Sequence, residues 1–287
     1  MKSVLLAALL LSVAQAPAVA GEPATLWAPK GISSDRFESH AAFDPRTGDL
    51  WFVRSAPDFT GWRLLVSSCG PKGWTEARPS PISADGVEAD PWFSPDGRTL
   101  WFISNRTTDG IKREATDIWR VTREASGKWG TPRRLPAPVN SDNYEWFPRV
   151  GVDGWLYFGS GQDGGQGKTD IWRAHEDSGS WRIENLGSAI NTAGNDYEPL
   201  LSADGRFMLI NTDDGFYRSE RTTTGWSPRV KLGPEINVNG TEVGGALSPS
   251  GNTLLFARDT KDKTSGEFFV AHLGAREAWP PACPKKK

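Results

Sequence analysis

Five acidic residues recur along the chain at nearly even intervals: Glu38, Glu88, Glu145, Asp196 and Glu242, separated by 50, 57, 51 and 46 residues. Each stands just before a short apolar run that enters a turn containing Gly or Asp. Side chains at one position of a structural repeat share one face of the fold, so five carboxyl groups should converge. Such groups could serve as acid and base, hold a hard cation such as calcium, or form ion pairs within the fold.

Ion pairing is the favoured interpretation of this acidic ring. Two carboxylates about 8 Å apart repel by about 2 kcal/mol at an effective dielectric near 20, so converging acids need cationic partners. Arg54 and Arg258 occupy matching positions in the first and fifth repeats and can supply two of them. The candidate ligand-binding residues are therefore the five acids, these two arginines, His40 beside the ring, and Trp92 and Trp146 on the inner strands.

No catalytic residue is assigned from the sequence. Acids repeated at one position favour a shared scaffold, whereas a catalytic pair should break the pattern. The chain contains neither G-x-S-x-G nor HExxH, so a nucleophilic triad or a zinc site has no motif. The acidic runs NTDDG (211–215) and DTKDKTSGE (259–267) match no dedicated calcium loop; a bound Ca²⁺ stays open without assigned ligands, and no other cofactor is expected.

The elements that position these acids repeat with them. Five tryptophans recur at a similar interval: Trp74, Trp129, Trp181, Trp226 and Trp279. Turns that contain Asp-Gly or Ser-Gly join apolar runs at 94–97, 152–154, 202–205 and 248–251. Repeats of roughly 40 to 50 residues with several short strands are typical of β-propeller blades. We predict an all-β, single five-bladed propeller of four-stranded antiparallel blades, with six blades as the alternative.

The predicted blades span residues 38–87, 88–144, 145–195, 196–241 and 242–282. The C-terminal sequence is too short to form the outer strand of the last blade, and residues 24–34 can supply this strand. This placement is expected because Ile32 stands six residues before Glu38, just as an aliphatic residue stands six residues before every other ring acid. The N-terminal strand would then close the ring and cover an open edge.

Two segments, SPDGRTLWFISNR (94–106) and SADGRFMLINTDD (202–214), resemble the WD-repeat-like propeller repeats of TolB and its relatives. ENLGSAINTAGNDYEPLLSADG (184–205) is similar to the form of this repeat in bacterial envelope proteins. The resemblance covers nearly the whole chain after residue 20 and implies a periplasmic propeller. The N-terminal domain of TolB is not expected here, and TolB is usually described with six blades, so its particular partners are not carried over.

Residues 1–20 combine Lys2, the apolar run VLLAALLLSVA and an Ala-x-Ala site ending at Ala20, the pattern of a secretory signal peptide. We expect residues 21–287 to form the mature periplasmic or secreted protein, with no membrane span. The formal net charge of −2 argues against a nucleic-acid binder, which needs a basic surface. In an oxidising compartment Cys69 and Cys283 are candidates for a disulfide that latches the first and last blades.

These observations lead to one functional hypothesis and one alternative. The hypothesis is a monomeric, non-catalytic propeller that binds an envelope protein or a small ligand, such as a glycan. The alternative is a glycan-active hydrolase or lyase that uses acidic residues at the centre of the propeller.

Overall fold

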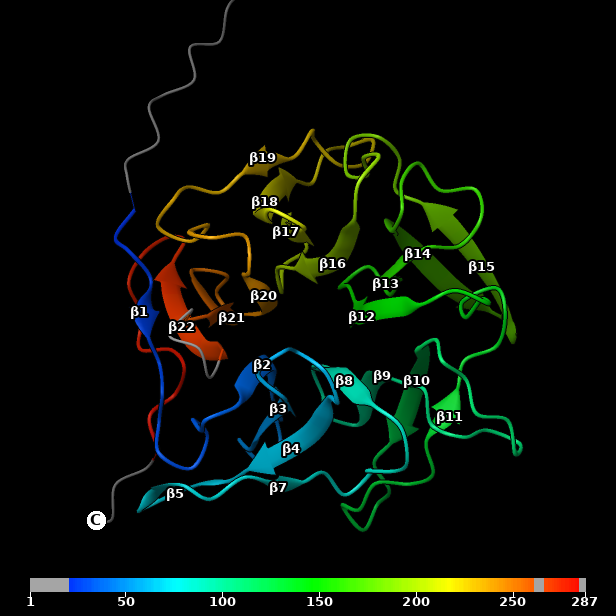
Figure 1. The fold of residues 1–287 in the computed structure, drawn as a ribbon. Coiled ribbons are helices and arrows are strands. Elements are labelled where there is room, and N and C mark those ends of the chain that lie inside the picture. Colours follow the sequence, from blue (N-terminus) through cyan, green and yellow to red (C-terminus); the bar gives the residue numbers. More distant parts are fainter. Residues whose placement is uncertain (1–20, 261–265, 284–287) are drawn as a thin grey trace, which may run out of the picture.

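The computed structural model of the protein describes residues 21–260 and 266–283. Five four-stranded antiparallel sheets stand around a common centre, as blades of a β-propeller (Figure 1). The prediction of an all-β, five-bladed propeller is confirmed, and the six-bladed alternative is wrong. No helix within the described residues is long and apolar enough to cross a membrane. The proposed signal peptide lies outside the described residues.

Each blade runs from an inner strand at the centre to an outer strand at the rim, which has two residues in every blade but the third. The first blade holds β2 (Phe37–Phe43), β3 (Leu50–Ser55), β4 (Arg63–Ser67) and β7 (Arg78–Pro79). The second holds β8 (Glu88–Phe93), β9 (Thr99–Ser104), β10 (Asp117–Thr122) and β11 (Arg133–Arg134). The third holds β12 (Glu145–Val150), β13 (Leu156–Ser160), β14 (Asp170–Asp177) and β15 (Ser180–Asn185).

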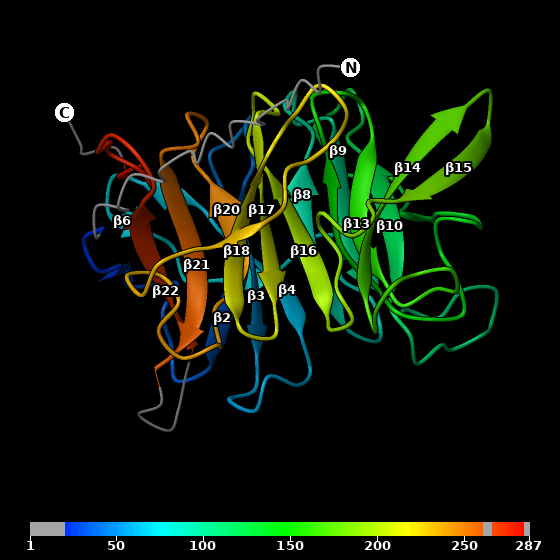
Figure 2. The same ribbon diagram turned by 90° about the horizontal axis from the view of Figure 1, so that it is seen from above.

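The fourth blade consists of β16 (Asp196–Leu201), β17 (Phe207–Thr212), β18 (Gly215–Glu220) and β19 (Val230–Lys231). The fifth consists of β20 (Val243–Leu247), β21 (Thr253–Asp259), β22 (Gly266–His272) and β1 (Thr25–Leu26), and a small hairpin pairs β5 (Cys69–Gly70) with β6 (Gly73–Trp74). Seen from the side, the β14–β15 hairpin of the third blade projects from the rim (Figure 2).

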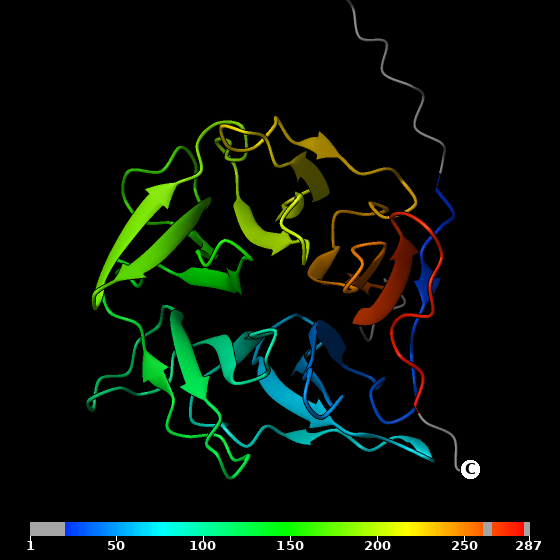
Figure 3. The same ribbon diagram turned by 180° about the vertical axis from the view of Figure 1, so that it is seen from behind.

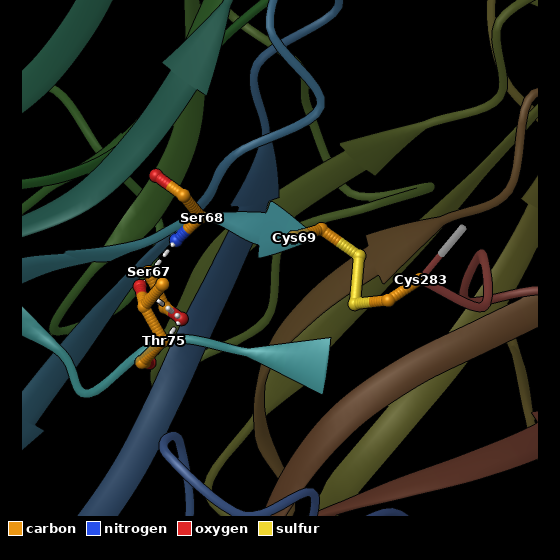
Figure 4. The surroundings of a disulfide bond; sticks show 5 residues. All are labelled: Ser67, Ser68, Cys69, Thr75 and Cys283. Carbon is orange, nitrogen blue, oxygen red and sulfur yellow. Dashed lines mark hydrogen bonds between the residues drawn. A yellow bond between two sulfur atoms is a disulfide. The ribbon is translucent and has the colours of Figure 1, made fainter. Parts of the chain in front are cut away.

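The two ends of the chain close the ring. Strand β1 pairs antiparallel with β22, with Thr25 opposite Val270, as the sequence predicted for the last blade. Figure 3 shows this N-terminal strand beside the C-terminal blade from the other side of the ring. A disulfide joins Cys69 to Cys283, with Cα atoms 5.2 Å apart, and so ties the first blade to the C-terminal segment (Figure 4).

Apolar side chains fill the spaces between neighbouring blades. One cluster joins the first blade to the second through Trp51, Leu64, Phe93 and Trp119, all of which are buried. Trp129, which opens the outer segment of the second blade, packs edge-on against Trp51 with ring centroids 5.9 Å apart. Large aromatic rings at repeated positions therefore hold the blades together and fix the inner strands that carry the site.

Candidate functional site

The acidic ring lies at the junctions between blades. All five acids are buried, and each accepts hydrogen bonds from the turn three or four residues before it; Ala84 N, for example, donates to Glu88 at 2.8 Å. Four of them contact an arginine: the pairs are Glu38–Arg54 (2.6 Å), Glu88–Arg106 (2.8 Å), Glu242–Arg258 (3.1 Å) and Asp196–Arg229.

The arginines also contact the backbone six positions before four of the acids. Arg54, Arg106 and Arg258 donate to the carbonyl oxygens of Ile32, Ile82 and Ile236, and Arg229 donates to that of Ile190. Each of these four carboxylates therefore contacts both a guanidinium group and the turn that precedes it. The geometry supports the ion-pair interpretation for them, and it adds Arg106 and Arg229 to the two arginines that the sequence offered.

Glu145 is the exception in the ring. Its Oε1 atom accepts hydrogen bonds from Ser141 and Ser160, at 2.6 and 2.9 Å, but its buried Oε2 atom has no hydrogen-bond partner among the described residues. Burial, aided slightly by the nearby Asp117 carboxylate, raises the pKa of Glu145 to about 7. Glu145 is therefore a ring acid held without an arginine.

The side chains that could be reactive at the centre of the propeller come from the position two residues after each ring acid. The residues at this position are His40, Asp90, Phe147, Glu198 and Gly244, so the repeat breaks its pattern here. A β-bulge interrupts every inner strand at this point. His40, Asp90 and Phe147 adopt φ values of 55°, 55° and 49°. Left-handed backbone costs a non-glycine residue about 1 kcal/mol or more, and bulges of this kind redirect side chains beside functional sites.

His40 and Asp90 meet across two blades. His40 Nε2 lies 3.3 Å from Asp90 Oδ1, and His40 Nδ1 lies 2.6 Å from the Ser39 hydroxyl. Burial and the Arg149 charge lower the pKa of His40 to about 3, so the imidazole is neutral near pH 7. Burial raises the pKa of Asp90 to about 7, although the Phe147 amide donates to its Oδ2 at 2.8 Å. Asp90 can therefore take or give a proton near neutral pH.

A second buried pair accompanies the first. Arg149 Nη2 lies 3.4 Å from Glu198 Oε1, and Glu198 Oε2 accepts a hydrogen bond from Gly244 N. Burial raises the pKa of Glu198 to about 8 and lowers that of Arg149. The Arg149 charge also lowers the pKa values of His40 and Asp90, so the two pairs are electrostatically linked.

An aromatic pocket of about 170 Å³ opens over the His40–Asp90 pair. Its remaining lining residues are Phe59, Trp62, Ala89, Trp146, Phe147, Tyr197 and Val243. Trp146, predicted as a ligand contact, lies in this wall. Trp92, its partner in that prediction, is not among the described lining residues, although both tryptophans pack against the apolar cluster between the second and third blades. The pocket thus combines a buried acid–base group with aromatic walls, the composition of many small-molecule sites.

A larger hollow of about 460 Å³ lies between the first two blades, away from these residues. Its buried charges, Arg123 and Asp44, pair with each other, and the Arg123 guanidinium stacks 4.2 Å from the centre of the Trp129 ring. This hollow therefore presents a satisfied ion pair rather than a reactive group.

The acidic runs considered as calcium ligands have other partners where they are described. Asp214 accepts from Lys231 at 2.7 Å, and Asp213 accepts from Asn195 at 3.0 Å. Residues 261–265 of the other run lie outside the described residues. Within 21–260 and 266–283, no group of three or more His, Cys, Asp or Glu side chains is placed to hold a metal ion.

Comparison with known proteins finds similarity of fold only. No protein-family model and no curated protein matches the sequence. Among solved structures, a putative TolB from Agrobacterium tumefaciens superposes with a TM-score of 0.50 at 16% identity, covering 83% of this chain and 84% of that one. A glucose dehydrogenase superposes with a TM-score of 0.50 at 13% identity, covering 88% and 99%. A gluconolactonase from Xanthomonas campestris has a TM-score of 0.49 at 12% identity, covering 90% and 99%.

The resemblance to TolB-type propellers therefore holds at the level of fold, and the prediction of a non-catalytic protein is wrong. That prediction took acids repeated at one position as the mark of a shared scaffold. The glucose dehydrogenase, which shares the fold, is an enzyme by its name, so the fold itself does not mark a non-catalytic protein. The prediction rested on the ring acids, whereas the residues that differ between blades stand two positions after them.

Proposed function

We propose that the protein is a hydrolase or lyase that acts on a small molecule in the central pocket, with Asp90 as its acid–base group. The contact between Asp90 and the neutral His40, beneath aromatic walls, carries this proposal. The acid–base role is thus given to a residue two positions after a ring acid, whereas the alternative predicted from the sequence gave it to the ring acids themselves.

The protonation states suit general acid–base chemistry. If the Ser39 hydroxyl donates to His40 Nδ1, the single imidazole proton sits on Nε2 and faces Asp90 Oδ1, which supports the ionised carboxylate. Ionised Asp90 can then accept a proton from water or from a substrate carbon, and neutral Asp90 can return it to a leaving group. The Phe147 amide fixes the carboxylate during both steps.

The proposal includes an exported location, where the substrate would be met outside the cytoplasm. The Cys69–Cys283 disulfide supports this part, because disulfides persist in oxidising compartments. A monomeric state and an envelope partner remain predictions of the sequence.

Turnover of glucono-δ-lactone, 4-nitrophenyl acetate and 4-nitrophenyl glycosides, measured from pH 5 to 9, tests the proposal. Asp90→Asn should lower the rate on any accepted substrate by about 10²- to 10⁴-fold, the usual contribution of general acid–base catalysis, while circular dichroism shows an intact fold. Glu145→Gln, a ring acid outside the pocket lining, serves as the matched control and should retain the rate. Equal rates for wild type and Asp90→Asn, or no turnover of any compound, would overturn the assignment.

A further inference from the structure

The central pocket is unusual in how few free polar atoms it offers. Among the described lining residues, the polar or charged side chains apart from the tyrosine hydroxyl and indole nitrogens are His40 and Asp90. Two of those other groups are already engaged: Trp62 Nε1 donates to Phe59 O at 2.7 Å, and the Tyr197 hydroxyl donates to Thr212 O at 3.0 Å. A sugar enclosed here would leave several hydroxyl groups unpaired, at about 1 to 3 kcal/mol each.

The aromatic walls also meet at different angles. The Trp62 and Trp146 rings cross at 71° with centroids 5.7 Å apart, and Phe59 is tilted by 58° against Trp62. The Phe147 and Tyr197 rings are nearly parallel, 19° apart. Walls in several orientations fit a rounded group on more than one side, whereas a flat ring can lie against only one of two crossed faces.

The charge of the pocket has one sign. Asp90 is the only lining residue with a formal charge when ionised, and no lysine or arginine belongs to the described lining. Arg149, the buried cation whose charge acts on Asp90, lies 3.4 Å from Glu198 and is not among the described lining residues. Aromatic faces and a carboxylate both attract cations, and the attraction reaches about 2 kcal/mol or more where water is excluded.

We propose that the pocket binds an alkylammonium group, a tertiary or quaternary amine carried by the substrate, with its methyl groups against the aromatic walls and its charge above Asp90. This inference rests on the proposed function in that it names the chemistry of the substrate, but the binding step does not require turnover. A volume of about 170 Å³ is below the roughly 300 Å³ from which whole drug-sized ligands are enclosed, so the pocket takes one head group of a larger molecule.

Such a ligand would also prepare the acid–base group. A cation beside Asp90 favours the ionised carboxylate and lowers its pKa from about 7. Substrate binding would thereby convert Asp90 to its proton-accepting form. The affinity for a permanently charged amine should accordingly rise as the pH increases through 7.

Titration of the intact protein with choline, followed by tryptophan fluorescence and calorimetry, tests the inference. Its neutral isostere 3,3-dimethyl-1-butanol has the same shape without the charge, and glucose represents a free sugar. We expect choline to bind at least about 10-fold more tightly than the isostere, which corresponds to 1.4 kcal/mol, and glucose not to bind. Equal binding of choline and the isostere, or binding of glucose alone, would overturn the inference.

Three variants locate the site. Asp90→Asn and Trp62→Leu should each weaken choline binding by about 10-fold, and Trp155→Leu, whose indole lies outside this pocket against Arg173, should leave it unchanged. Trp62→Leu keeps the test decisive if Asp90→Asn does not fold. Choline binding with no Asp90-dependent turnover would overturn the proposed enzyme alone, whereas Asp90-dependent turnover in a protein that does not prefer choline to its isostere would overturn this inference alone.

Discussion

Glu145→Gln should make the protein more resistant to unfolding at pH 8 but not at pH 5. Glu145 is fully buried and accepts hydrogen bonds from Ser141 and Ser160 through one oxygen. The charged groups that interact with it electrostatically are Asp117 and Arg134. Its pKa is about 7 in the folded protein against an ordinary value of 4.5. At about 1.4 kcal/mol per pH unit, this difference corresponds to about 3 kcal/mol.

The sign of the pH dependence follows from proton binding. Between pH 4.5 and 7 the folded protein holds a proton on Glu145 that the unfolded chain releases, so the free energy of unfolding falls as the pH rises through this range. Glutamine keeps the hydrogen bonds to its carbonyl oxygen and cannot ionise. The difference in stability between variant and wild type should therefore grow by up to about 3 kcal/mol between pH 5 and pH 8. Asp90 and Glu198, whose pKa values are also raised, are common to both proteins and cancel.

Urea unfolding at pH 5, 6.5 and 8, monitored by tryptophan fluorescence, measures this difference directly. Glu88→Gln is the matched control, because it removes a ring acid that is paired with Arg106 at 2.8 Å. Losing that partner leaves a buried guanidinium unpaired, so the control should be destabilised at pH 8. A stability difference for Glu145→Gln that is the same at pH 5 and pH 8 would refute the reasoning, because it would show that Glu145 does not titrate near neutrality.

Two further predictions concern closure of the ring and the backbone of the site. Cys283→Ser removes the disulfide to Cys69, which spans 214 residues, and should lower the free energy of unfolding by about 2 to 4 kcal/mol while β1 still closes the last blade; an unchanged urea midpoint under non-reducing conditions would contradict this. Gly244→Ala places a Cβ atom 2.6 Å from His40 N at φ +67°, so it should cost more than about 1 kcal/mol and change the His40 imidazole signals in NMR. Gly48→Ala, at φ +74° with open space around it, isolates the cost of the backbone angle, and an equal loss in both variants would count against the close contact.

The sequence predicted the scaffold because the features of the scaffold repeat. The ring acids, the aliphatic residue before them and the tryptophans recur in each blade, and four of the five acids make the same contacts with an arginine and a turn. Closure by residues near Thr25 was predictable for the same reason, since one blade lacked an outer strand. Two arginine partners, Arg106 and Arg229, were missed because they do not align with Arg54 and Arg258.

The site escaped prediction because it depends on a bulge that sequence spacing does not reveal. In a regular strand, His40 and Glu38 would point to the same face, as residues two apart do. The left-handed backbone at His40, Asp90 and Phe147 instead gives these residues a direction of their own. The available signal was compositional, since this position changes from blade to blade while the acid two residues earlier does not.

This division between constant and divergent positions has a physical cause. Rotation about the propeller axis places equivalent residues in a circle, so an ionisable residue repeated in all five blades would set like charges against one another near the axis. The repeated acids are tolerated because most of them pair with an arginine at a blade junction. A functional centre on the axis requires unlike residues in place of copies, and the divergent position supplies three of them: His40 faces Asp90, and Glu198 faces Arg149, which lies two residues after Phe147. In a five-fold repeat of this kind, catalytic groups are therefore expected at positions where the residue type differs from blade to blade.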